Sequence, residues 1–303
     1  MSPLERVSAH LALPDGARRT QWSPFGVRLA GGDPAPLIAT GHAAAQDEAS
    51  QLAALALAAA PLSGTDARWL DLCAGPGGKA RLLACLAAAR DARLVAAELR
   101  PHRAARVREA LDRIPAPAPD APASNSPASD GPAANDRAPR VEAQVVVADG
   151  RRAPWRPGTF DRVLADVPCS GLGSLRRRPE ARWRKSPSDI PELAELQRQL
   201  LRSAIDSVRP GGVVAYVTCS PHVAETHDIV TAVTGERSDV TILDAPAILN
   251  DGLLDAEIPG LPAPRDKRFA QFWPHRHGTD AIFLALLIRW EDVSPQTPLI
   301  TRG

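Results

Sequence analysis

Two cysteines stand where their side chains could form and break a covalent bond. Cys169 follows an apolar run that ends at Asp166, and Cys219 follows a second apolar run that ends at Thr218. Short apolar runs bounded by turn residues predict buried strands, so both thiols fall at strand ends. A single free cysteine is more often a small buried hydrophobe than a catalyst. Two strand-end thiols beside the carboxylate of Asp166 favour a shared nucleophilic site.

A glycine-rich turn follows an earlier predicted strand and opens a predicted helix. Such a turn lets the backbone pass close under a ligand, although the glycine pattern alone fits an ordinary tight turn equally well. Two further acids at strand ends favour a nucleotide-like cofactor, Glu98 for the ribose hydroxyls and Asp149 for an adenine amino group. The turn consists of Cys73, Ala74, Gly75, Pro76, Gly77, Gly78 and Lys79.

A basic run with one aromatic residue follows Cys169. Charge runs are usually solvated surface, but this one flanks the predicted thiol site, and phosphates and bases would find cations and a stacking surface there. We therefore predict an RNA-binding surface. Its residues are Arg176, Arg177, Arg178, Arg182, Trp183, Arg184 and Lys185.

The pattern beyond residue 60 alternates apolar strands with helices, which predicts an α/β fold with a parallel sheet covered on both faces. The expected strands lie at 68–73, 94–98, 141–148, 163–166, 213–218 and 281–288, and the expected helices at 46–60, 78–89, 102–114, 190–208 and 224–233.

Three segments are expected along the chain. Residues 1–45 read as the remnant of a small RNA-binding α+β domain, and residues 46–303 as the catalytic domain. Within the latter, residues 115–139 are rich in proline and alanine and predict a disordered insertion.

The composition narrows the class of protein. The chain has 303 residues, 44% of them hydrophobic, and a net charge of +1, so any affinity for nucleic acid must come from local patches. Its four cysteines are scattered without metal-ligand spacing, which argues against zinc and disulfides. Without a signal-peptide pattern or a membrane-length apolar stretch, we expect a cytoplasmic monomer that uses neither a metal nor a membrane.

These motifs together resemble the RsmB/NOP (Sun, fmu) family of RNA cytosine-C5 methyltransferases. The glycine turn, the Pro-Cys-Ser-Gly motif at Cys169, the Thr-Cys-Ser motif at Cys219 and the stretches 46–52 and 273–280 carry the resemblance. It implies a Rossmann-like class I methyltransferase fold: a doubly wound, mostly parallel seven-stranded sheet with its last strand antiparallel. It also implies S-adenosylmethionine as cofactor, contacted by residues 73–79, Glu98, Asp149 and Asp166.

The resemblance also implies how the thiols divide the work on RNA, with small-subunit 16S rRNA as the expected substrate. Carbon 5 of cytosine is a poor nucleophile until a thiolate adds to carbon 6, and Cys219 would form that bond. Asp166 would hydrogen-bond ring nitrogen 3, and Cys169 would assist release of the thiolate.

The chain departs from family relatives in two places. Only about sixty residues precede the first expected strand, so the usual N-terminal RNA-binding helical domain is not found there, and we expect a shortened version or an internal start. Relatives often carry Glu-Asn after the Thr-Cys-Ser motif, whereas here Glu225 is followed by Thr226, which weakens any role assigned to that position.

Three alternative functions stay open. The substrate could be a tRNA, or the chain could be an inactive RNA-binding scaffold, which loss of a cysteine, Asp166 or the glycine turn would have favoured. A DNA cytosine methyltransferase ranks lower, because that class uses one cysteine in the fourth-strand loop and would leave Cys219 unexplained.

Overall fold

The computed structural model describes residues 16–41, 43–115, 141–183, 186–251 and 257–291. Nearly all of the predicted insertion at 115–139, the first fifteen residues of the predicted N-terminal remnant, and Arg184 and Lys185 of the predicted RNA surface therefore lie outside the described residues.

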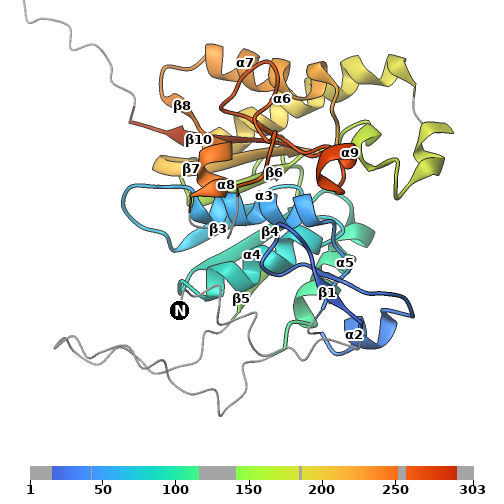
Figure 1. The fold of residues 1–303 in the computed structure, drawn as a ribbon. Helices are drawn as coiled ribbons and strands as arrows, with labels where there is room; N and C mark the ends of the chain where they lie inside the picture. Colours follow the sequence, from blue (N-terminus) through green and yellow to red (C-terminus); the bar gives the residue numbers. More distant parts are fainter. Residues whose placement is uncertain (1–15, 42, 116–140, 184–185, 252–256, 292–303) are drawn as a thin grey trace, which may run out of the picture.

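An eight-stranded sheet forms the centre of the molecule (Figure 1). Its strands are β3 (Arg68–Asp71), β4 (Arg93–Glu98), β5 (Glu142–Val147), β6 (Phe160–Asp166), β7 (Val208–Thr218), β8 (Val240–Leu243), β9 (Ala270–Gln271) and β10 (Phe283–Arg289). The order across the sheet is β5-β4-β3-β6-β7-β10-β8, and β9 pairs with β10 outside this path.

The strand directions confirm the predicted doubly wound fold. Strands β5, β4, β3, β6 and β7 are parallel, whereas β10 runs antiparallel to both β7 and β8. The chain builds outward from β3 to β5 and then returns to place β6 on the other side of β3. This reversal is the switch point at which doubly wound sheets bind ligands, at the carboxyl ends of the strands.

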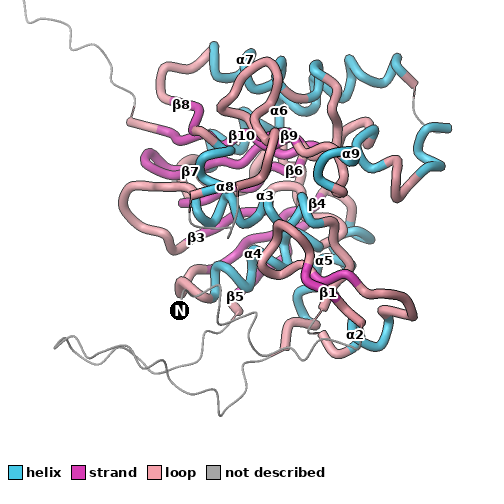
Figure 2. The backbone as a smooth tube through the Cα atoms, in the orientation of Figure 1, coloured by secondary structure: helices cyan, strands magenta, loops and turns pink. Residues whose placement is uncertain are grey.

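Helices cover both faces of the sheet, as Figures 1 and 2 show. One face carries α3 (Glu48–Ala59), α4 (Gly78–Ala88), α5 (Pro101–Asp112) and α8 (Ala245–Asn250); the other carries α6 (Ile190–Ser207) and α7 (His227–Gly235). Helix α3 lies between the sheet and its neighbours α4 and α8, so Leu52, Leu55 and Leu57 are all fully buried. That position explains why α3 is apolar around most of its circumference.

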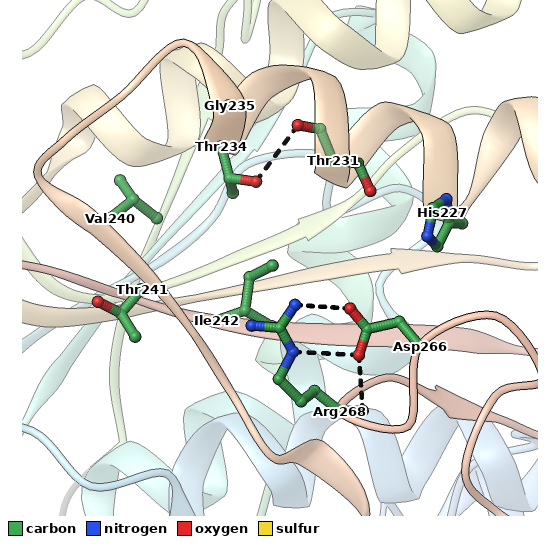
Figure 3. Close-up of a pocket in the computed structure, with 9 residues that line it drawn as sticks. All are labelled: His227, Thr231, Thr234, Gly235, Val240, Thr241, Ile242, Asp266 and Arg268. Carbon is green, nitrogen blue, oxygen red and sulfur yellow. Dashed lines mark hydrogen bonds and ion pairs between the residues drawn. The ribbon is translucent and has the colours of Figure 1, made fainter.

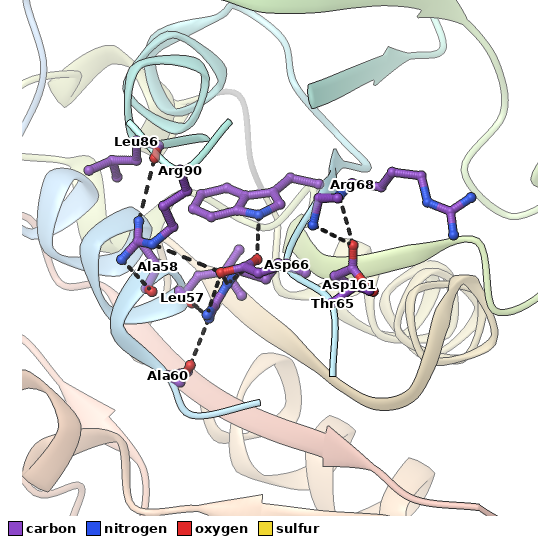
Figure 4. Close-up of polar contacts among 12 residues, drawn as sticks. Leu57, Ala58, Ala60, Thr65, Asp66, Arg68, Leu86, Arg90 and Asp161 are labelled. Atoms are coloured by element: carbon purple, nitrogen blue, oxygen red, sulfur yellow. Dashed lines mark hydrogen bonds and ion pairs between the residues drawn. The ribbon is translucent and has the colours of Figure 1, made fainter. Parts of the chain in front are cut away.

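A buried arginine fixes the end of α3 on the sheet. The guanidinium of Arg162, in β6, donates hydrogen bonds to the carbonyl oxygens of Leu57 at 2.5 Å and Ala60 at 2.7 Å. It also pairs with Asp66, which Figure 4 shows near Leu57 and Ala60, and its guanidinium carbon lies 5.5 Å from the ring centroid of Trp69. Arg162 thus supplies the donors that the last turn of α3 would otherwise lack.

The N-terminal segment packs against the opposite end of α3. It forms a short hairpin of β1 (Arg18–Arg19) and β2 (Val27–Arg28), followed by α2 (Ala35–Ala39). Its loop buries Trp22, whose backbone N–H donates to Glu48 and whose indole donates to the carbonyl of His277 in α9 (Pro274–His277).

Several element boundaries differ from the sequence prediction, and β8 and α8 were not predicted. Strand β7 begins at Val208, five residues early, because Val208 pairs with Phe160 before an irregularity lets Val213 pair with Arg162. Helix α7 begins at His227 rather than at residue 224, because η4 (Val223–Glu225) forms a separate 3-10 turn. No helix in the described part of the chain is both long and apolar enough to cross a membrane.

Candidate active site

The two predicted cysteines meet at the carboxyl edge of the sheet. Strands β6 and β7 are parallel neighbours in which Asp166 pairs with Val217, so the loops that follow them emerge side by side. The Sγ atoms of Cys169 and Cys219 lie 3.0 Å apart, and both cysteines are free and partly buried. This separation is a hydrogen-bond contact, well beyond the length of a disulfide bond.

The contact makes the two thiols unequal. The hydrogen bond from Cys169 lowers the pKa of Cys219, and the nearby Lys79 ammonium adds to this, against burial and the charge of Asp166. The same hydrogen bond, together with burial and the charges of Cys219 and Glu225, raises the pKa of Cys169 well above its ordinary value. Cys219 is therefore the more acidic thiol of the pair, and Cys169 is the less acidic one.

Lys79 links the glycine turn to the carboxylate beside the thiols. Its Nζ lies 2.8 Å from Oδ2 of Asp166 and 3.3 Å from Oγ of Ser50 in α3. Burial lowers the pKa of Lys79, but the ion pair with Asp166 outweighs it and raises that pKa overall. The buried, charged ammonium of Lys79 therefore lies between the predicted cofactor site and the predicted thiol site.

The glycine turn lies against Glu98. Arg103 donates to the carbonyl of Gly75 at 2.6 Å and pairs with the Glu98 carboxylate at 3.4 Å. A Cβ added at Gly75 would lie against the Glu98 carboxylate and 2.8 Å from Nε of Arg103, so these two side chains fill the space beside Gly75. Gly77 adopts φ +115°, a left-handed conformation that favours glycine.

Asp149 lies at the same edge but has a partner of its own. Arg151 donates to both of its carboxylate oxygens at 2.7–3.1 Å, and its backbone N–H donates as well. These hydrogen bonds lower the pKa of Asp149. Arg151 thus holds the Asp149 carboxylate in one orientation, and that carboxylate is partly exposed at the end of β5.

The sequence reading missed two residues beside the turn. Asp71 ends β3 fully buried, and neither carboxyl oxygen has a hydrogen-bond partner among the described residues. Burial, and then the charge of Asp166, raises its pKa to about 8. Leu99 directly follows Glu98 and is 54% exposed, which offers an apolar surface at the edge of the sheet. Their strand-end positions were the available signal.

The predicted RNA surface divides into two parts. Arg176 and Arg177 form ion pairs with the buried carboxylate of Asp280, and Arg176 also pairs with Asp47 at the start of α3. These contacts anchor the loop after Cys169 to two other segments.

The rest of the described basic run projects from that anchored loop. Arg178 is exposed, and Trp183, in η2 (Pro179–Trp183), is 80% exposed. The guanidinium of Arg182 lies 4.9 Å from the Trp183 ring centroid. An exposed indole with a cation over it is a surface on which a nucleic-acid base can stack.

A surface hollow of about 390 Å³ lies elsewhere, between α7 and β8 (Figure 3). Its lining includes His227, Thr231, Thr234 and Arg268, and it contains none of the predicted site residues. Arg268 is already paired with Asp266, so the hollow offers little net charge.

Comparisons with known proteins show the family to which the chain belongs. A model of the family described as 16S rRNA methyltransferase RsmB/F matches residues 57–120 and 133–288. A Mycobacterium tuberculosis (strain H37Rv) protein described as a methyltransferase is 46% identical over 94% of this chain and 57% of its own length. The ribosomal RNA small subunit methyltransferase B of Sodalis glossinidius is 34% identical over 84% of this chain and 48% of its own length. The chain therefore spans about half the length of the curated relatives it matches.

Solved structures share the architecture. The crystal structure of PH0851 superimposes with a TM-score of 0.71 at 26% identity, over 91% of this chain and 54% of that one. The structure of NSun6 from Pyrococcus horikoshii with SFG gives 0.64 at 21% identity, over 88% of this chain and 58% of that one. The second likeness concerns the fold alone.

Proposed function

Because the chain belongs to the 16S rRNA methyltransferase RsmB/F family, we propose that it transfers a methyl group from S-adenosylmethionine to carbon 5 of an RNA cytosine, with 16S rRNA as the substrate. The observation that carries the proposal is the Cys169–Cys219 contact of 3.0 Å beside Asp166. Two thiols of unequal acidity are what addition to a pyrimidine and subsequent release require.

The residues at the switch point fit S-adenosylmethionine. The cofactor carries an amino group and ribose hydroxyls, and the unpartnered buried carboxyl of Asp71 and the carboxylate of Glu98 are acceptors for such donors. Leu99, which is 54% exposed, offers an apolar surface for a flat ring. When bound, the cofactor supplies an electrophilic methyl group.

Cys219 acts as the nucleophile in this proposal. Its thiolate adds to carbon 6 of the cytosine, and the displaced electron pair makes carbon 5 electron-rich enough to accept a methyl group. A proton shared between Asp166 and ring nitrogen 3 offsets the charge that develops on the ring. Lys79, 2.8 Å from Asp166, holds that carboxylate in place and adds positive charge nearby.

Cys169 then assists release. A water molecule takes the proton from carbon 5, the electrons of that carbon–hydrogen bond restore the ring double bond, and the electrons of the carbon–sulfur bond return to Cys219. A hydrogen bond donated by the Cys169 thiol, whose sulfur lies 3.0 Å from that of Cys219, would stabilise the departing thiolate. Without this donor, the covalent protein–RNA complex is expected to persist.

The exposed part of the basic run would hold the RNA strand. Arg178 and Arg182 are suited to phosphates and Trp183 to base stacking. Since the target atom must enter a partly buried site, the cytosine would be single-stranded or flipped out of a helix.

Methyl transfer from labelled S-adenosylmethionine to rRNA and tRNA, followed by mapping of the modified base, tests the proposal. We expect 5-methylcytosine in 16S rRNA. Label only in tRNA would identify a tRNA methyltransferase, and RNA binding without label would identify a scaffold.

Two cysteine variants test the division of roles. Cys219→Ala should be inactive and form no adduct, whereas Cys169→Ala should accumulate a covalent protein–RNA complex. Cys85→Ala, in α4 away from the cleft, serves as the control. An adduct in the Cys219 variant instead would reverse the two roles.

A further inference from the structure

One buried carboxylate lies behind both cysteine loops. Glu225, at the end of η4, is fully buried. Its Oε1 accepts hydrogen bonds from the backbone N–H of Ser170 at 2.7 Å and from Nε2 of Gln197 at 3.1 Å. Its Oε2 accepts from the hydroxyls of Ser170 at 2.5 Å and Ser220 at 2.6 Å. Ser170 and Ser220 are the residues that directly follow Cys169 and Cys219.

The surroundings hold Glu225 rigidly in this position. The hydroxyl of Tyr216, inside β7, donates to the Glu225 carbonyl at 2.9 Å. Gln197, fully buried in α6, donates both to Glu225 and to the carbonyl of Pro168, just before Cys169. A single carboxylate therefore joins the loop after β6, the loop after β7 and helix α6.

The charge of Glu225 is balanced by hydrogen-bond donors rather than by a cation. Among the described residues, no lysine or arginine forms an ion pair with it. A buried negative charge of this kind disfavours a second one beside it, and the charge of Glu225 contributes to the raised pKa of Cys169. If Ser170 and Ser220 only packed the two loops together, no carboxylate would be needed between their hydroxyls.

We propose that Glu225 is a positioning residue that clamps the two cysteine loops in contact and keeps Cys169 as the proton-bearing thiol of the pair. This inference rests on the roles proposed above for Cys219 and Cys169. Family relatives often carry Glu-Asn where this chain has Glu225 and Thr226, and that difference weakened any role expected for this position. Only the second residue of the pair differs, however, and the carboxylate that the proposal needs is retained.

Two substitutions separate the clamp from the charge. Glu225→Gln keeps the size and one oxygen but removes the charge. Glu225→Asp keeps the charge but is one methylene shorter, so it does not reach both serines. Glu192→Gln, an exposed residue of the same α6 that carries Gln197, is the matched control.

Contact between the loops is measured without RNA or cofactor. Diamide oxidises two adjacent thiols to a disulfide and takes up their two hydrogens on its azo group, so the rate of the Cys169–Cys219 crosslink, followed by peptide mass spectrometry, reports their proximity. We expect Glu225→Asp to slow the crosslink about tenfold or more, while Glu192→Gln matches the unsubstituted chain.

The charge effect is measured by site-resolved alkylation with iodoacetamide across a pH range. Glu225→Gln should shift Cys169 alkylation to lower pH, and Glu225→Asp should restore the original profile. The other charged groups facing the thiols, namely Lys79, Asp166, Arg177 and Asp280, are unchanged in both variants. In methyl transfer, both variants should lower kcat about tenfold or more while leaving the KM for S-adenosylmethionine unchanged.

Crosslinking and alkylation that match the control in both variants would overturn the inference and leave Glu225 as packing. If either variant fails to fold, Ser220→Ala, which removes one hydroxyl from the clamp, must slow the crosslink; an unchanged rate there would overturn the inference equally. A chain that shows the expected thiol behaviour but methylates no cytosine would refute the proposed function and leave the clamp standing.

Discussion

Replacement of Gly173 by alanine should separate the two cysteine loops. Gly173, in η1 (Leu172–Ser174), donates its N–H to the carbonyl of Cys219 at 2.9 Å and accepts from the N–H of Ala281 at 2.8 Å. An added Cβ would lie 2.8 Å from the Cys219 oxygen and closer still to the Ala281 oxygen, whereas ordinary contact begins near 3.4 Å. Both obstacles are backbone atoms, so no side-chain rotation relieves the clash.

The size of the effect follows from that geometry. The loops must move apart by at least about 0.6 Å on the Cys219 side, and a misplacement approaching 1 Å costs on the order of 100-fold in rate. Two backbone hydrogen bonds weaken at the same time, which lowers the free energy of unfolding by about 1–3 kcal/mol. Gly173→Ala should therefore stay folded while its kcat falls about 100-fold.

Three measurements check this prediction: kcat for methyl transfer, the rate of the Cys169–Cys219 crosslink with diamide, and urea unfolding. Gly235→Ala is the control, because an added Cβ there meets nothing within 4 Å. We expect kcat and crosslinking to fall together in Gly173→Ala and not in the control. A variant with reduced stability but the original kcat and crosslinking rate would show that loop spacing does not set the chemistry.

Three further predictions concern stability, RNA binding and pH. Arg162→Met leaves Asp66 and two α3 carbonyls without their buried partner, so urea denaturation should show a loss of about 3–5 kcal/mol; a loss below about 1 kcal/mol would contradict the anchoring role. Arg182→Ala should raise the KM for RNA and reduce the slope of its salt dependence by about 1, whereas Trp183→Ala should raise KM with the slope unchanged; equal slopes in both would mean that Arg182 contacts no phosphate. Cys169→Ala removes the hydrogen bond that most lowers the pKa of Cys219, so alkylation of Cys219 should require higher pH, and a profile at or below the original pH would show that Cys169 does not stabilise the thiolate.

The sequence predicted the fold well because parallel strands buried on both faces leave a plain signal. The strands predicted to end at Cys73, Glu98 and Asp166 end within two residues of those positions, at Asp71, Glu98 and Asp166. The early part of β7 was missed because Pro210 and Gly211 interrupt its pattern, although Val208 still pairs with Phe160. A local break in the apolar pattern therefore hides a stretch of strand whose pairing is set by the neighbouring strand, here β6.

The site was predicted less completely, because some of its contacts join residues far apart in the chain. The cysteines could be placed from their own strands. The ion pair of Arg176 with Asp280 spans 104 residues, and that with Asp47 spans 129, so no local pattern separates these anchoring arginines from the exposed Arg178. Glu225 resembles a solvated loop acid in the sequence, and only the meeting of two loops buries it.

The order in which the chain is synthesised affects when the site around Cys169 and Cys219 can form. The segment just before β10 supplies both Asp280, which holds Arg176 and Arg177, and Ala281, which holds Gly173. A growing chain can therefore complete its parallel strands while the loop that carries Cys169 still lacks its contacts with Asp280 and Ala281. Until β10 docks against β7, the loop that carries Cys169 lacks these contacts, so we expect a nascent chain stalled before residue 280 not to hold Cys169 against Cys219.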